Sequence, residues 1–382
     1  MRRCCLVVPL FVLAACAAPG PTSASRPSAP PAASPGVTAT SRVPSEPLFV
    51  VLESSSGSLL APDTIAIAGL DGYARAKTRF KPHAAPWVLP DLSPLVPQIA
   101  HVAAGRAYYV DGDGVVRSLG VDGSVREETR FPVTSSQQEV SFAVSPDGRS
   151  LVGSVVTLPS EPTPAPTPGY IPTTPISMDV LTATAGSAAS VADHQTWSFQ
   201  GGMGSGAQFV GWDGGGPVAT WPSGLGTQGG GPHQWNGVTL VHFAGGRPGA
   251  AVAAPAGCFP MDLLPTGVFA CGRGDPTIRV LGPDGGEVWR LTASDAGGAV
   301  TYGFLSPDAQ RVVALGMRTT VYSRSGAPVV LPDSFFHSGW IDSQTIAGSV
   351  GTASDFGYVA LGNPGHAVDL GFKGQFVGGL LT

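Results

Sequence analysis

Two cysteines late in the chain have the spacing of a hairpin disulfide. Cys258 and Cys271 flank the turn-forming stretch 263–267 symmetrically to within one residue. In an antiparallel hairpin this register places the two side chains nearly opposite each other, at a separation that a disulfide can span. A stable disulfide requires an oxidising compartment. The spacing therefore predicts a Cys258–Cys271 bond in an exported protein, the alternative being two buried free thiols.

The N-terminal segment carries signals for export. Two arginines precede an apolar run over 6–15, which is too short to span a bilayer. The run ends in Leu-Ala-Ala-Cys16, which resembles a bacterial lipobox. The resemblance implies cleavage before Cys16 and attachment of a diacylglycerol to its thiol. We therefore expect 1–15 to be a lipoprotein signal peptide and the mature protein to be lipid-anchored at the extracytoplasmic face of the cell membrane. The alternative is an ordinary secretory signal.

The next segment is compositionally a tether. Residues 16–46 are nearly all Ala, Pro, Ser, Thr and Gly, and such a segment buries too little apolar surface to fold. Residues 47–382 remain for the folded domain, which we expect to be monomeric. The net charge of −5 gives no electrostatic footprint for nucleic acid.

Repeats indicate the architecture of the folded part. Long amphipathic helical patterns are absent, and short apolar runs alternate with turn residues, which is typical of all-β proteins. Turns of the Asp-Gly or Ser-Gly type recur about 49 residues apart, close to the length of one four-stranded propeller blade. They lie at Gly72, Gly123, Gly285, Gly326 and Gly365, with weaker copies at Gly186 and Gly249.

A second hairpin type supports the same repeat. Ser-Pro-Asp turns at 145–147 and 306–308 lie between apolar runs, each about 25 residues beyond an Asp-Gly turn. This pattern resembles the TolB-like and WD40-like propeller families, in which the turn joins the first two strands of a blade. We therefore predict an all-β, seven-bladed β-propeller, six or eight blades being alternatives. A strand over 375–381 remains after the seventh blade, and we predict that it closes the ring by completing the first.

Two long insertions indicate a binding face. Residues 159–177 and 222–236 each follow the second strand of a blade, so both are expected on one face of the domain. The ligand-binding candidates there are Trp212, Trp221, His233 and Trp235. Trp212 and Trp221 have a second interpretation, as strand residues packed between blades.

Two functions stay open from the sequence. No catalytic elbow, zinc motif or complete calcium loop is present, and the sequence indicates no catalytic residue, metal or cofactor. The first function is a membrane-tethered, extracytoplasmic binding scaffold for an envelope protein or a polymer such as a glycan. The alternative is a propeller enzyme of the lyase or lactonase type with its site in the central channel.

Overall fold

The computed structural model describes residues 46–57, 61–83, 98–158, 175–197, 206–223, 240–252, 254, 258–272, 276–293, 302–316, 318–351 and 355–380. The chain divides into two compact units, Met1–Val43 and Pro44–Thr382, and every described residue belongs to the second. These residues form strands and turns, and no helix among them could cross a membrane. The predicted signal peptide and Cys16 lie outside the described residues.

Five sheets contain four antiparallel strands each, in an order that follows the chain. They are β4–β7 (Ala100–Ala103, Arg106–Val110, Val115–Leu119, Val125–Arg130), β8–β11 (Gln138–Val144, Ser150–Thr157, Ile176–Thr184, Ser190–Trp197), β12–β15 (Gly206–Asp213, Gly216–Ser223, Leu240–Ala244, Arg247–Ala251), β16–β19 (Phe259–Leu263, Phe269–Gly272, Thr277–Leu281, Glu287–Thr292) and β20–β23 (Gly303–Leu305, Arg311–Leu315, Thr319–Ser323, Val329–Val330).

The sixth sheet joins the two ends of the folded unit. It has the order β24-β25-β26-β27-β1-β2-β3, with bounds Phe335–Asp342, Thr345–Val350, Asp355–Ala360, Ala367–Leu380, Leu48–Glu53, Thr64–Gly69 and Ala74–Arg79. The first half of the long strand β27 pairs with β26, and its second half pairs with β1. Counting β27 in both halves gives seven groups of four strands. We call them blades 1 to 7, beginning with the group of β1.

The turns of these blades follow the repeats in the sequence. Positive φ angles of 77 to 118° allow tight hairpins between the third and fourth strands at Gly72, Gly123, Gly186, Gly285 and Gly326. The Ser-Pro-Asp turns join β8 to β9 and β20 to β21, the first two strands of their blades. One predicted turn is wrong: Gly249 lies inside β15, and the turn of that blade is at Gly245 and Gly246.

The two ends of a blade carry different connections. Since neighbouring strands run in opposite directions, the hairpins between strands one and two and between strands three and four share one end, which we call the hairpin face. The connections between strands two and three and between blades share the other end, the insertion face. The predicted insertions lie between strands two and three of blades 3 and 4, and the strand ends that flank them are at the insertion face. Residues 176–177 and 222–223 belong to β10 and β13 instead of to the insertions, and residues 159–174 and 224–236 lie outside the described residues.

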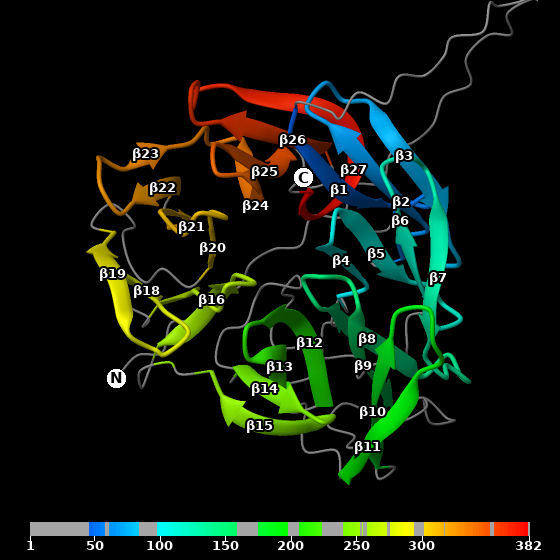
Figure 1. Cartoon of the computed structure of the whole chain (residues 1–382). Helices are drawn as coiled ribbons and strands as arrows, with labels where there is room; N and C mark the ends of the chain where they lie inside the picture. Colours follow the sequence, from blue (N-terminus) through cyan, green and yellow to red (C-terminus); the bar gives the residue numbers. More distant parts are fainter. Residues whose placement is uncertain are drawn as a thin grey trace, which may run out of the picture. The chain divides into compact units, whose positions relative to one another are not determined.

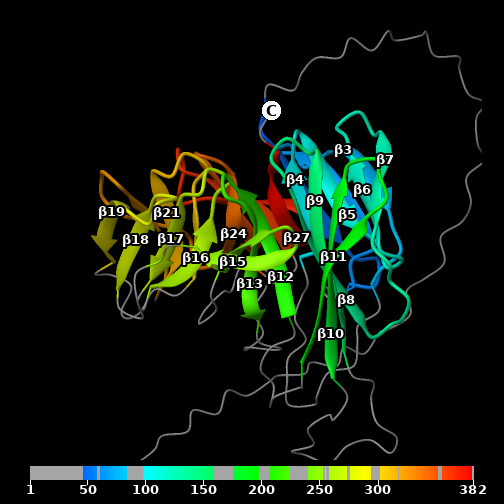
Figure 2. The ribbon, with the colours of Figure 1, turned by 60° about the horizontal axis from the view of Figure 1, so that its bottom comes forward.

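Hydrophobic clusters join each blade to the next, and the arrangement is a β-propeller (Figures 1 and 2). One cluster spans blades 1, 2 and 3, and the others lie between blades 3 and 4, 4 and 5, 5 and 6, 6 and 7, and 7 and 1. The first strands of neighbouring blades also contact one another, as β27 contacts β4 and β20 contacts β24. These first strands therefore surround the central axis.

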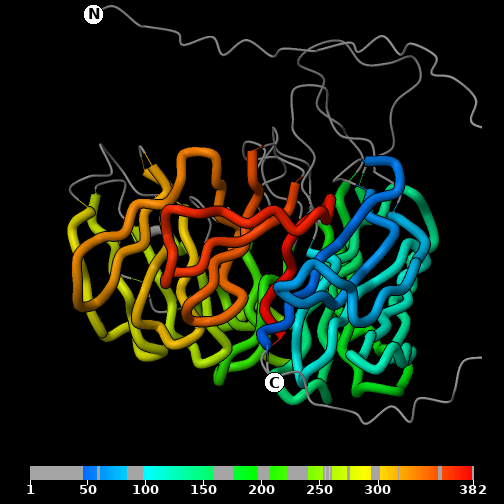
Figure 3. The backbone as a smooth tube through the Cα atoms, turned by 90° about the horizontal axis from the view of Figure 1, so that it is seen from above, coloured from blue at the N-terminus to red at the C-terminus, as the bar shows by residue number. Residues whose placement is uncertain are grey.

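The last strand closes the ring, as the sequence predicts. Leu380 of β27 pairs with Leu48 at the start of β1, and Figure 3 shows the red end of the chain beside the blue start of the first strand. Glycines allow β27 to lie this close to its neighbours. A Cβ atom on Gly374 would overlap the carbonyl oxygen of Leu52, and one on Gly379 would overlap that of Ile341 in β24.

We predict that Gly379→Ala weakens this closure. The new methyl group meets backbone atoms of β24, which cannot rotate away, so we expect the free energy of unfolding to fall by about 1–3 kcal/mol. Gly378→Ala is the matched control, because its Cβ atom would lie 3.1 Å from a methyl group of Val102, a side chain that can adjust. Denaturant unfolding of both variants checks this, and equal stability of the two would contradict it.

Candidate functional site

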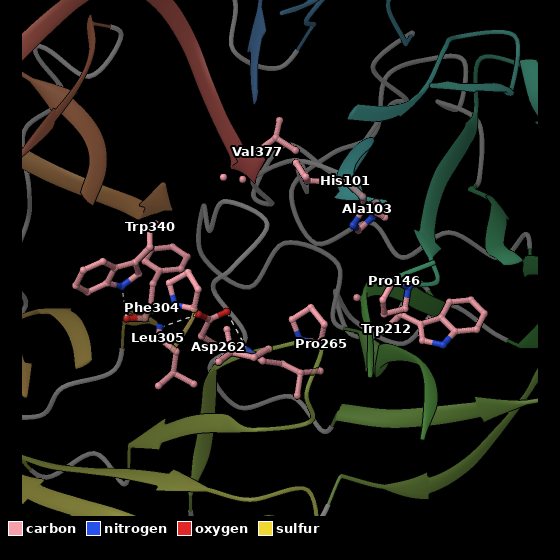
Figure 4. A pocket seen from close by; sticks show the side chains of 18 of the residues that line it. His101, Ala103, Pro146, Trp212, Asp262, Pro265, Phe304, Leu305, Trp340 and Val377 are labelled. Carbon is pink, nitrogen blue, oxygen red and sulfur yellow. Dashed lines mark hydrogen bonds between the residues drawn. The ribbon is translucent and has the colours of Figure 1, made fainter. Parts of the chain in front are cut away.

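The first strands of the seven blades line a cavity of about 600 Å³ on the propeller axis, which is open on one side (Figure 4). Each strand contributes at least one residue: β4, β8, β12, β16, β20, β24 and β27 contribute, for example, His101, Val144, Trp212, Asp262, Phe304, Trp340 and Val377. A cavity of this size suits a small organic ligand.

Hairpin turns form the rim of the cavity. Ala104, Gly105, Pro146, Pro265 and Pro307 belong to turns between the first and second strands, so the cavity lies at the hairpin-face end of the axis. The predicted binding face, at the two insertions, is the opposite one.

The Ser-Pro-Asp turns hold their prolines in place through side-chain hydrogen bonds. In the first turn, Ser145 Oγ donates to Asp147 Oδ1 over 2.6 Å and accepts from the backbone N–H of Ser150. The second turn repeats this pattern, since Ser306 Oγ donates to Asp308 Oδ1 over 2.6 Å and accepts from the N–H of Arg311. Such local bonds fix the turn, and the rim is therefore largely preformed.

Irregular pairing in three first strands coincides with the large or charged side chains of the cavity wall. Register shifts occur in β12 beside Trp212, in β16 between Pro260 and Asp262, and in β24 on either side of Trp340. A β-bulge changes the side to which the following residue points. In β16, Met261 packs between blades 5 and 6 while the next residue, Asp262, lies in the cavity wall.

Both carboxylate oxygens of Asp262 accept hydrogen bonds from the backbone. Oδ2 accepts the backbone N–H of Leu305 over 2.7 Å, and Oδ1 accepts the N–H of Leu263 over 2.9 Å (Figure 4). The first bond connects the first strands of blades 5 and 6. Burial raises the pKa of Asp262 to about 7, although both N–H bonds act in the opposite direction.

Tyr302 and His337 are neutral at neutral pH. Burial lowers the pKa of His337 to about 3, and its Nε2 atom has no hydrogen-bond partner among the described residues. Burial and the charge of Asp262 raise the pKa of Tyr302 to about 12. The rings of Tyr302 and His337 lie 5.2 Å apart. His101, across the cavity, is buried with its ring edge-on to Phe142.

The sequence-predicted site residues separate in the structure. Trp212 lines the cavity and also packs against the cluster between blades 3 and 4. Trp221, in β13, packs against the same cluster with its ring edge-on to Phe243 at 6.1 Å. His233 and Trp235 lie outside the described residues. Asp262 and Trp340 were not predicted from the sequence, although the Ser-Pro-Asp turns that form part of the rim were.

The predicted disulfide between Cys258 and Cys271 is present, with 5.4 Å between the Cα atoms. It links the residue before β16 to β17. The bond therefore fixes the strand that carries Asp262. In the part of the chain that the structure describes, no group of three or more His, Cys, Asp or Glu side chains is arranged to hold a metal ion.

Comparisons with known proteins support the fold. No family model and no curated protein matches the chain. The acylaminoacyl peptidase of Pyrococcus horikoshii is 11% identical, with 85% of this chain and 52% of that chain covered and a TM-score of 0.50. This chain therefore spans about half of that peptidase.

Two further solved structures are similar. An oligogalacturonate lyase in complex with manganese is 10% identical over 84% of this chain and 89% of that chain, with a TM-score of 0.42. The β-propeller domain of Cps50 (Swd1) from Myceliophteria thermophila is 11% identical over 70% and 84%, with a TM-score of 0.41. At these identities the likeness concerns the β-propeller fold alone.

The raised pKa of Asp262 predicts a pH dependence of stability. An acid whose pKa is higher in the folded than in the unfolded chain stabilises the fold at low pH, and this contribution is lost as pH rises through the folded value, here about 7. The free energy of unfolding of the unmodified protein, minus that of Asp262→Asn, should therefore decrease from about pH 4.5 to about pH 8. Denaturant unfolding across this range measures the difference.

The subtraction isolates Asp262 from other titrating groups. Burial also raises the pKa of Glu139 to about 7, but Glu139 is present in both proteins and cancels in the difference. A difference that does not vary with pH would contradict the prediction.

Proposed function

We propose that the protein is a binding scaffold, tethered by a lipid on Cys16 to the extracytoplasmic face of the cell membrane. The observation that carries the binding function is the axial cavity. Its described walls consist mainly of apolar, aromatic, proline and glycine residues on seven strands of one rigid ring. Such a preformed cavity binds by burying apolar ligand surface at little ordering cost.

The disulfide supports export. Disulfides persist in oxidising compartments and are rare where thiols are kept reduced. The Cys258–Cys271 bond therefore fits the compartment that the N-terminal signal implies.

The start of the folded unit supports a tether on the hairpin face. Leu48 begins β1 beside Leu380 at this face, and two residues earlier Glu46 forms an ion pair with Arg75. Arg75 also pairs with Asp71 over 2.7 Å, in the turn between β2 and β3. The folded unit therefore begins on the side of the cavity rim, and the insertion face is its opposite side. We propose the insertion face as the surface that engages an envelope protein or a glycan.

One observation favours the alternative function, an enzyme of the lyase or lactonase type. A carboxyl group with a pKa of about 7 suits general acid–base catalysis near neutral pH, and Asp262 lies in the cavity wall. However, the hydrogen bond from the N–H of Leu305 already gives Asp262 a structural role in joining blades 5 and 6. We therefore place binding first.

We predict that Cys16→Ala abolishes lipidation. The variant lacks the thiol that accepts the lipid, so labelled palmitate should be present on the unmodified protein and absent from the variant. Metabolic labelling of cells that express either form measures this. Equal labelling of the two forms, or no label on either, would refute the lipid tether. The binding function would be unaffected by that result.

We predict that a partner binds through the insertion face. The test is covalent cross-linking in cells followed by affinity capture and mass spectrometry, with a variant in which 160–174 and 224–235 are replaced by short Gly-Ser turns. These limits leave β9, β10, β13 and β14 intact. A protein or glycan captured by the unmodified protein should be lost with the variant.

Equal melting temperatures of the two forms serve as the control for folding. Capture of the same partner by both forms would exclude the insertion face as the interaction surface.

A further inference from the structure

The cavity wall contains the carboxylate of Asp262, for which no described residue supplies a positive charge. Two ionisable side chains, Asp262 and His101, are among its described lining residues, and no lysine or arginine is. Asp262 forms no ion pair with a described residue, and its pKa responds to burial and to backbone N–H groups, with no nearby cation contributing. The ionised carboxylate is therefore a negative charge in a mainly apolar enclosure.

Asp262 retains hydrogen-bonding capacity toward the cavity. A carboxylate has about four lone-pair sites, and the two backbone bonds use one on each oxygen. The side chain is only partly buried, and it lies between Pro265 and Leu305 in the cavity wall (Figure 4). A donor group inside the cavity can reach it without breaking the bond between blades 5 and 6.

The remaining walls suit the apolar body of a ligand with a cationic head. Trp212, Phe304, Trp340 and Phe376 belong to the lining from four different strands, although Phe304 and Trp340 are almost fully buried in the cluster between blades 6 and 7. Trp340 is fixed, since its Nε1–H donates to the carbonyl oxygen of Phe304 over 2.9 Å. Together with the prolines of the rim, the lining provides apolar area for a hydrocarbon chain or ring. An anionic ligand finds no cationic side chain among the described lining residues.

We propose that the cavity binds an organic ammonium ion, a protonated amine on an apolar body, with Asp262 as its counter-ion. This proposal rests on the binding function proposed above and specifies the class of ligand. The ammonium group donates to the carboxylate oxygens, and the apolar body packs against the apolar walls. The same chemistry occurs in a free aralkyl amine and in the lysine side chain of a peptide. The cavity of about 600 Å³ can hold the whole of a small amine, which favours the free amine.

The test compares three probes of the same shape with different heads: 4-phenylbutylamine, 4-phenylbutanol and 4-phenylbutyrate. Their affinities are measured near pH 8 by calorimetry and ligand-detected NMR with the purified full chain carrying Cys16→Ala, which avoids detergent. Both the ammonium ion and the hydroxyl group can donate to the carboxylate, but only the ammonium ion carries the opposite charge, so the amine should bind at least about 10-fold more tightly than the alcohol. The carboxylate probe should bind most weakly.

Two variants test the role of the carboxylate. Asp262→Asn removes the charge and should reduce the preference for the amine over the alcohol to nearly one. Asp284→Asn is the matched control, because Asp284 accepts a backbone N–H in a hairpin-face turn outside the cavity lining, and the preference should persist. Nα-acetyl-lysine methylamide represents the lysine side chain of a peptide. Tighter binding of this probe than of 4-phenylbutylamine would identify a peptide side chain, and not a free amine, as the ligand.

Three results would overturn the proposal. Equal affinities of the three probes would show an apolar cavity without charge selectivity. Absence of binding by all three would reject the cavity as an amine site. Persistence of the preference in Asp262→Asn would reject the counter-ion. The probe series on the unmodified cavity remains decisive even if Asp262→Asn fails to fold, and none of these results bears on the cross-linking partner of the insertion face.

Discussion

The pairing of β27 with β1 is the constraint on which the rest of the structure depends. A four-stranded blade has two faces that must be buried, and in this ring each face is covered by one of the two neighbouring blades. The ring therefore has to end where it begins, and the second half of β27 supplies the first strand of blade 1. That segment lies between β4 and β24 and forms one wall of the axial cavity. The same pairing brings the end of the described chain to the start of β1 on the hairpin face.

Most of this architecture could be predicted because its signals are local. Asp-Gly turns require positive φ at the glycine, and Gly123 and Gly285 show it. The two Ser-Pro-Asp turns share the same hydrogen bonds within a few residues. Closure could be predicted because one strand remained without a partner. The wrong turn at Gly249 has a local cause as well: glycines flank Arg247 and Pro248 on both sides, and the pattern did not distinguish them.

The cavity could not be predicted in the same way, because it depends on seven strands that meet only in three dimensions. Within each strand, alternation should indicate which side chains face the axis, but the bulges in β12, β16 and β24 interrupt the alternation. Trp212, Asp262 and Trp340 lie next to these interruptions. The long insertions made the opposite face the predicted binding face. Trp221, close to one insertion, packs against the cluster between blades 3 and 4.

Asp262 unites the fold and the proposed ligand site. Its two backbone bonds hold the carboxyl group at one point of the wall whether or not a ligand is present, so orienting the acid costs little on binding. The same enclosure disfavours the ionised form, as the raised pKa shows. An ammonium ion that enters the cavity would remove this disadvantage by supplying the opposite charge. The unfavourable burial of the free carboxylate is therefore a source of selectivity for cationic over neutral ligands.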